Sequence, residues 1–385
     1  MDAVAPARLA EPWDNVGLLL GDRAAACSRV LVSVDWTPQV LAEAVAVRAD
    51  AVVSYHPPIF DALKRLDSAD PAQAALLGAA RAGIALLSPH TAYDAVQGGM
   101  TDWLAEGLAG GPRELARASA HEALRPASRL AAGERFKLVA FVPAAASGAL
   151  RAALADAGAG RIGAYDHCTT RHGVTGSFRG GEGTRPAVGR RGRVEEVAEE
   201  RVETVVSAER LPWAIAAMRA VHPYEEPAFE VHALSPRPSL DEGAGRLLEL
   251  RRDQPLAAIA ARLRRFLGAP RVDAVVAGAR HRRIAVCPGA GAGFLPDAVA
   301  RGATLLVTGE ARHHEQLAAR AAGVSMLLAG HAWTERGCMP RLARALSAAL
   351  PGATFLVASS DAPPLTDPGA RPRPARAARR PARPR

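Results

Sequence analysis

The sequence contains few cysteines. Its four cysteines, Cys27, Cys168, Cys287 and Cys338, lie far apart and form no Cys-x-x-Cys pair. This spacing argues against both a disulfide scaffold and a zinc knuckle. We therefore expect reduced thiols and a cytoplasmic location.

Long apolar runs are also missing, since no stretch approaches the roughly 18 uninterrupted apolar residues that suggest a membrane-spanning helix. The opening residues, MDAVAPARLAEPWDN, lack the basic and apolar regions of a secretory signal. We expect neither a membrane span nor secretion.

Lysine is nearly absent, with two residues, whereas arginine is abundant. Residues 361–385 hold seven Arg and two Asp, and so carry five of the nine net positive charges. This tail is rich in proline and poor in large apolar side chains, which predicts disorder. Its arginines could contact nucleic acid, but without interleaved aromatic residues we expect such contact to be nonspecific.

With 385 residues, 49% of them hydrophobic, the chain is long enough for two to three domains. From residue 29 to about 109, strand-like apolar runs alternate with amphipathic segments of helical length, and the same alternation resumes near residue 250. This pattern is typical of a parallel sheet with crossover helices. The two stretches are interpreted as halves of one α/β core.

A different pattern separates the two halves. Expected strands at 136–143, 165–180, 201–209 and 228–236 combine with expected helices at 147–158 and 211–221 in the order β-α-β-β-α-β. This order is the split βαβ, or ferredoxin-like, arrangement. We predict a core at 1–130 and 241–360, an inserted α+β domain at 131–240, and a disordered tail at 361–385.

Polar side chains that can bind metal follow four of the expected strands. Ligands of open α/β sheets collect at the carboxyl ends of strands. One histidine there would more often be solvent-exposed or a helix cap, and Asp94 and Glu335 could themselves be caps. The coincidence at four strand ends instead predicts a site for a divalent ion such as Zn, Mn, Fe, Co or Ni. The residues concerned are His56; His90 and Asp94; Glu310, His313 and His314; and His331 and Glu335.

Two other motifs have a structural and a functional interpretation. The loop 289–293, GAGAG, could bind phosphate through backbone N–H groups or could be a tight turn near the site. Trp13, Asp14 and Asn15 are expected to fix an N-terminal loop against the sheet, with substrate contact as the alternative.

Six motifs resemble, in order and spacing, those of the NIF3-like proteins, which are also catalogued as GTP cyclohydrolase 1 type 2 homologs. The resemblance spans residues 10–358 and implies a discontinuous α/β core. Residues 158–180 and 222–234 further resemble the inserted PII/CutA-like domain of one subgroup. The six motifs are WDNVGLLLGD (13–22), SYHPPIF (54–60), HTAYDAVQGGMTDWLAEGLA (90–109), PGAGAGF (288–294), TGEARHHE (308–315) and GHAWTERG (330–337).

The resemblance implies a dinuclear metal centre in a hexameric ring. Carried over by motif, the ligands are His56, Asp94, His331 and Glu335, with Glu335 bridging the two ions. The family's first histidine falls on Tyr55, and neutral tyrosine, with a pKa of about 10, is a poor ligand. We therefore expect one or two divalent ions per subunit, the second held only by His331 and Glu335.

Two functions are compatible with these residues. The first is a metal-dependent hydrolase of a nucleotide-like or heterocyclic substrate, with His90, Asp94 and Glu335 as catalytic candidates. Tyr55, Glu310, His313 and His314 would then surround the metal ligands. The alternative is a non-catalytic, metal-binding regulatory or scaffold hexamer that binds a small molecule.

Overall fold

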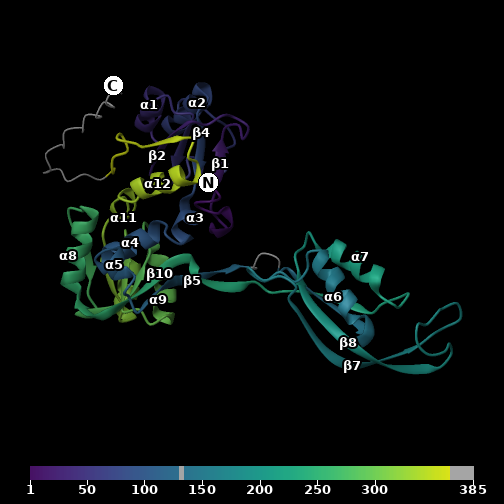
Figure 1. Ribbon diagram of the computed structural model, residues 1–385. Helices are drawn as coiled ribbons and strands as arrows, with labels where there is room; N and C mark the ends of the chain where they lie inside the picture. The colour runs from purple at the N-terminus through teal and green to yellow at the C-terminus, as the bar shows by residue number, and fades with distance from the viewer. Residues whose placement is uncertain (130–133, 365–385) are drawn as a thin grey trace, which may run out of the picture. The chain divides into compact units, whose positions relative to one another are not determined.

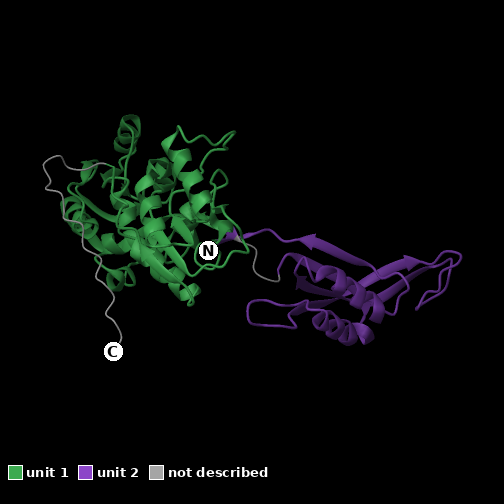
Figure 2. Cartoon of the chain, turned by 90° about the horizontal axis from the view of Figure 1, so that it is seen from above, with its two compact units in different colours: residues 1–127, 239–385 green, residues 128–238 purple. Residues whose placement is uncertain are grey.

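The computed structural model describes residues 1–129 and 134–364. The chain forms two compact units (Figure 2). One contains Met1–Ala127 together with the chain from Ser239 onward, and the other contains Ser128–Pro238. Each unit has its own sheets and its own hydrophobic core.

The first unit contains a five-stranded sheet in the order β1-β4-β3-β2-β15. Its neighbouring strands are parallel except β1, which is antiparallel to β4. The strands are β1 (Gly17–Leu20), β2 (Arg29–Ser33), β3 (Ala51–Ser54), β4 (Ala85–Ser88) and β15 (Thr354–Val357).

A six-stranded sheet in the order β11-β14-β13-β12-β10-β5 completes this unit. In it β12, β13 and β14 are parallel, whereas β10 and β11 are antiparallel to their neighbours β12 and β14. The strands are β5 (Ala120–Arg129), β10 (Arg237–Pro255), β11 (Asp273–Val275), β12 (Arg280–Val286), β13 (Leu305–Thr308) and β14 (Ser325–Leu328).

Helices cover both faces of each sheet (Figure 1). Alternate strand residues point to opposite faces, so Val30 and Val32 pack toward α3 and α12, whereas Leu31 packs toward α1 and α2. The helices are α1 (Pro38–Ala46), α2 (Pro71–Ala82), α3 (His90–Ala95), α4 (Met100–Ala109), α5 (Pro112–Leu115), α8 (Leu256–Leu267), α9 (Leu295–Ala300), α10 (His313–Ala321), α11 (Trp333–Arg336) and α12 (Met339–Ala349).

Local signals explain where several helices begin and end. The Thr37 side chain accepts a hydrogen bond from the backbone of Val40 at the start of α1, and Asp70 caps α2 in the same way. Gly83 ends α2 in the left-handed conformation, which glycine adopts without steric cost. Helix α3 has six residues and no side-chain cap, so the sequence gives too little periodicity to predict it.

A buried ion pair joins the two halves of this unit. Arg246 on β10 contacts the carboxylate of Asp102 on α4 and donates to the carbonyls of Ala95 and Val96, which end α3. Both charged side chains are almost completely buried. Arg246 thus fixes the end of the short helix that carries Asp94.

The second unit contains one antiparallel sheet in the order β7-β8-β6-β9. Its helices α6 and α7 pack through Leu150, Leu154, Ala214 and Met218 on the strand residues around Leu138. The elements are β6 (Phe136–Pro143), α6 (Ser147–Asp156), β7 (Thr169–Arg179), β8 (Val194–Val206), α7 (Leu211–Val221) and β9 (Phe229–Ala233).

The ends of the described chain bear on two expectations. Within residues 1–129 and 134–364, no helix has the length and apolar character needed to cross a bilayer. Asp361, expected to begin the disordered tail, has a buried carboxylate that accepts from the backbone of Val34 at 2.7 Å. The rest of that tail, 365–385, lies outside the described residues.

Candidate metal centre

The carboxyl ends of both sheets in the first unit contribute to one cavity of about 610 Å³. Tyr55 and His56 follow β3, and His331 follows β14 in the loop before α11, which carries Glu335. Strand β3 pairs in parallel with β2 and β4, and β14 with β13, so the strand ends of each sheet lie at a common edge. This placement brings together residues 275 or more positions apart in the sequence.

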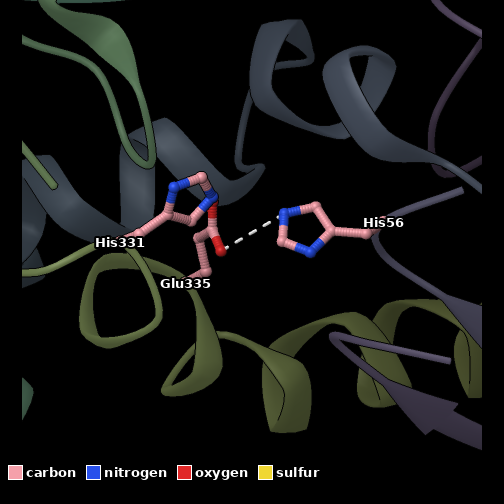
Figure 3. Close-up of side chains that lie close together, drawn as sticks. All are labelled: His56, His331 and Glu335. Carbon is pink, nitrogen blue, oxygen red and sulfur yellow. Dashed lines mark ion pairs between the residues drawn. The ribbon is translucent and has the colours of Figure 1, made fainter. Parts of the chain in front are cut away.

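Three side chains form the candidate metal-binding cluster, His56, His331 and Glu335 (Figure 3). Their ligand atoms all lie within 4.8 Å of one another. Glu335 Oε1 is 3.1 Å from His331 Nε2, and Glu335 Oε2 is 3.5 Å from His56 Nε2. Each imidazole thus faces the Glu335 carboxylate through its Nε2 atom.

The other nitrogen of each imidazole is held by a carboxylate. His56 Nδ1 lies 2.8 Å from Asp35 Oδ1, and His331 Nδ1 lies 3.0 Å from Glu310 Oε1. Arg336 contacts the second oxygen of Asp35. Such partners fix the ring orientation and leave Nε2 for a metal ion, as in carboxylate–histidine–zinc triads.

The carboxylates around the cluster favour the positively charged form of both imidazoles. Burial opposes protonation of His56, but the carboxylates of Asp35 and Glu335 prevail and raise its pKa to about 10. The hydrogen bond to Glu335 raises the pKa of His331 to about 9. Burial acts to raise the pKa of Glu335, yet the two imidazoles lower it, so the carboxylate is ionised.

The buried carboxylate fits a divalent ion. Glu335 is 2% exposed, and its Oε2 accepts no hydrogen bond within the described part of the chain. Gly289, at φ +60°, passes so close that an added Cβ would lie 2.6 Å from Glu335 Oε1 and 3.2 Å from His331 Nε2. Two imidazoles and a carboxylate suit a borderline ion such as zinc better than calcium.

Asp94, a fourth residue expected as a ligand, is engaged elsewhere. The Tyr55 hydroxyl donates to Asp94 Oδ1 at 2.6 Å, and Tyr55 is 1% exposed. Burial raises the pKa of Asp94 to about 6 and that of Tyr55 above its ordinary value. Asp94 lines the same cavity but does not belong to the three-residue cluster.

The remaining expected residues occupy different positions. His90 lines the cavity, and its Nδ1 lies 2.7 Å from Asp14 Oδ1. Glu310 is exposed and reaches the cluster only through His331. His313 and His314 begin α10 as exposed side chains and are not among the residues that line the cavity.

Sequence reasoning missed Asp35, and it expected Asp14 to fix an N-terminal loop, with substrate contact as the alternative. Asp35 follows β2 at the same edge of the sheet as His56, so the strand-end argument could have found it. Asp14 does fix its loop, because it accepts from the backbone of Thr91 at 3.1 Å and also contacts His90. The backbone at Gly289, in the loop 289–293, lies directly against the cluster.

The fold and this cluster define an interrupted α/β protein with a candidate metal centre. The chain belongs to the Duf34/NIF3 (NGG1p interacting factor 3) family, whose model matches residues 1–364. This match confirms the family that the six motifs predicted.

Relatives and solved structures agree with that assignment. A GTP cyclohydrolase 1 type 2 homolog of Mycobacterium tuberculosis is 36% identical over 317 residues, which cover 82% of this chain and 80% of the relative. The Bacillus subtilis protein of the same name is 31% identical over 328 residues, 85% of each chain. The structure of a Bacillus cereus protein related to NIF3 matches with a TM-score of 0.68 at 29% identity, covering 95% of this chain and 96% of that one. These matches confirm the mixed α/β fold.

Proposed function

We propose that this chain is a divalent-metal-dependent hydrolase that acts on a nucleotide-like or heterocyclic substrate. The observation that supports it best is the cluster of His56, His331 and Glu335, in which both imidazoles present Nε2 to a buried carboxylate. Three protein ligands that leave a position free are typical of catalytic rather than structural metal sites.

The neighbouring residues supply the acid–base groups that hydrolysis needs. A divalent ion held by the cluster would act as a Lewis acid and would acidify a water molecule. Asp94 lines the same cavity and, with a pKa of about 6, can accept a proton near neutral pH. His90, whose Nδ1 is bonded to Asp14, has Nε2 left for proton transfer.

We propose one tightly held ion per subunit, with Zn, Mn, Fe, Co and Ni as candidates. The motif resemblance implies a second ion, but Tyr55 stands where its histidine would be and donates a hydrogen bond to Asp94. The second ion would then rely on His331 and the shared Glu335, which gives too few ligands for tight binding.

A non-catalytic, metal-binding regulatory or scaffold hexamer is the second candidate. The bond between Tyr55 and Asp94 favours it, because it withdraws one carboxylate from metal chemistry. The second unit supports a regulatory role: its strand order, β7-β8-β6-β9, and its two helices fit the ferredoxin-like topology of a PII/CutA-like insert. Ring assembly, small-molecule binding, a cytoplasmic location and nonspecific contact of the tail with nucleic acid belong to this proposal as well.

Metal analysis and turnover together test the proposal. We expect about one divalent ion per subunit after purification without chelator, and turnover of a nucleotide panel supplied with Mn, Fe, Co or Zn. Glu335→Gln should lose both the ion and the turnover. Glu209→Gln, at an exposed position in the second unit, serves as the matched control and should lose neither.

The outcomes separate the two functions. A bound ion without turnover of any nucleotide would favour the regulatory alternative. Protein that binds no ion, even after incubation with each metal, would contradict both.

A further inference from the structure

Two large aromatic side chains at the candidate metal cavity are exposed although they are apolar. Trp13 is 61% exposed and Phe60 is 51% exposed, and both line the cavity that contains His56 and Glu335. Their ring centroids lie 6.0 Å apart, and their planes are tilted by 57°. Exposed apolar surface that gathers at a cavity indicates a binding site.

A line of rings connects these residues to the metal ligands. The His90 ring lies 6.1 Å from Trp13 and 6.4 Å from Phe60, between ring centroids. It also lies 5.5 Å from the ring of His56. A flat ligand held by the aromatic pair would therefore be next to the proposed ion and to His90.

The loops that carry the aromatic pair are fixed even though the rings are exposed. The Asn15 amide donates to the carbonyl of Ile59 at 2.7 Å, which ties the Trp13 loop to the Phe60 loop. Asp14 is held by His90 and Thr91. A pair positioned before the ligand arrives loses little conformational entropy on binding.

The arginine that lines the cavity argues for recognition of a ring rather than of an anion. Arg125 lines the cavity, but its guanidinium lies 4.6 Å above the Phe294 ring and pairs with Asp297 at 2.7 Å. Its charge is thus already neutralised. Aromatic faces stack on flat heterocycles whatever their substituents. A cavity of about 610 Å³ has room for a nucleoside.

We propose that Trp13 and Phe60 form a stacking site for a planar heteroaromatic ring of the nucleobase type and hold it at the candidate metal centre. As a substrate site this rests on the proposed function, but binding of the ring requires neither turnover nor metal. The competing occupant of this surface is a second copy of the chain.

Calorimetric titration of the full-length protein with guanosine tests the site, with ribose as the probe that lacks a ring. We expect guanosine to bind and ribose not to bind. Trp13→Ala and Phe60→Ala should each weaken guanosine binding by about ten-fold or more, the loss typical of one stacked base. Trp13→Phe should restore most of the affinity, because it keeps an aromatic face.

The control is Trp213→Ala, which removes a tryptophan that is 67% exposed in the second unit and should leave guanosine binding unchanged. Metal content and thermal melting of each variant report whether it is folded. Equal affinity of Trp13→Ala and the unmodified protein would overturn the inference. So would a change of oligomeric state on sedimentation without a change in guanosine affinity, since the aromatic pair would then be a subunit contact.

Failure of this inference differs from failure of the proposed function. If Trp13→Ala keeps its metal, its turnover and its affinity for guanosine, only the stacking site is overturned. Guanosine binding that depends on Trp13 in a protein that holds no ion would overturn only the hydrolase.

Discussion

The proposed number of ions at the candidate centre depends on Tyr55. Its hydroxyl lies 2.6 Å from Asp94, and the side chain is completely surrounded by protein. A tyrosine there contributes a proton donor, whereas a histidine would contribute a metal ligand. We therefore propose that this one difference from the family's motif separates a site for one ion from a site for two.

Replacing Tyr55 should change the metal count. We expect about one tightly bound ion in the unmodified protein and two in Tyr55→His, because the imidazole supplies a ligand and frees Asp94. Tyr55→Phe is the matched control, since it frees Asp94 without adding a nitrogen, and it should retain one ion. Native mass spectrometry after identical dialysis measures the count, and two ions in the unmodified protein would refute the prediction.

The two histidines also predict a pH dependence of stability for the metal-free protein. Their pKa values, about 10 for His56 and about 9 for His331, lie above the value of about 6.5 for an unfolded histidine. A raised pKa stabilises the fold fully below about pH 6.5, and this stabilisation is lost as the pH rises through 9 to 10.

The melting temperature of chelator-treated protein should therefore fall between pH 7 and pH 10. The decline should be smaller in His331→Gln, which removes one of the two groups. A melting temperature that is constant over this range, or that rises, would contradict the assignment of the protons to these imidazoles.

Short connections between elements position the site more than the elements themselves. The turn after β12 brings Gly289 against Glu335 and His331, and the six-residue helix α3 carries Asp94. Strand-end reasoning found His56, His331 and Glu335, because parallel strands bring their carboxyl ends together. It missed Asp35, because this residue was taken as the last of an expected strand at 29–35, and it missed α3, which is too short for a periodic signal.

The sequence did not predict which sheet each strand joins. Strand β15 pairs with β2 although more than 300 residues separate them, so the first sheet is completed by the last strand. Apolar periodicity specifies that a strand forms, but long-range packing decides its partner. The sequence therefore predicted that the two halves form one unit, but it could not predict that the strands of this unit divide into two sheets.

Gly289→Ala should weaken metal binding through the Glu335 carboxylate. The added Cβ would lie 2.6 Å from Glu335 Oε1, so the carboxylate must move. We expect a loss of about ten-fold or more in affinity for zinc, the range seen when groups that orient ligands are disturbed. The control is Gly268→Ala, which has a similar positive φ but no atom within 4 Å of the added carbon. Competition with a chromogenic chelator measures both, and equal losses would show that backbone strain alone is responsible.

The candidate metal centre belongs to one of the two units. The candidate ligands and the groups that hold them belong to the first unit, outside Ser128–Pro238. The proposed regulatory role belongs to the second unit, which has its own core.

Deleting residues 128–238 and joining the ends with a Gly/Ser linker should leave metal binding intact. The reason is that no candidate ligand is removed, so the metal content of the deletion variant should equal that of the full chain. Elemental analysis measures this, and circular dichroism checks that the variant is folded. A folded variant without metal would show that the cluster depends on the second unit.

Two truncations at the C-terminus should differ. Removal of residues 365–385 should leave metal content unchanged, whereas removal of 361–385 also takes away Asp361, which holds Arg336 and the backbone of Val34. Arg336 contacts Asp35, the partner of His56, so the longer truncation should lower zinc affinity. Equal affinities measured by chelator competition would show that this chain of contacts does not reach the metal site.

The contact between Asp361 and Arg336 also has a consequence for the time at which the centre forms during synthesis. His56 and Asp35 are made before the second unit, whereas His331, Glu335 and Asp361 are made after it. A ribosome-bound chain therefore lacks part of the candidate ligand set while the second unit is being made, and it completes the second unit before the first. An ion that needs all three side chains of the cluster would thus be captured only after the first unit closes.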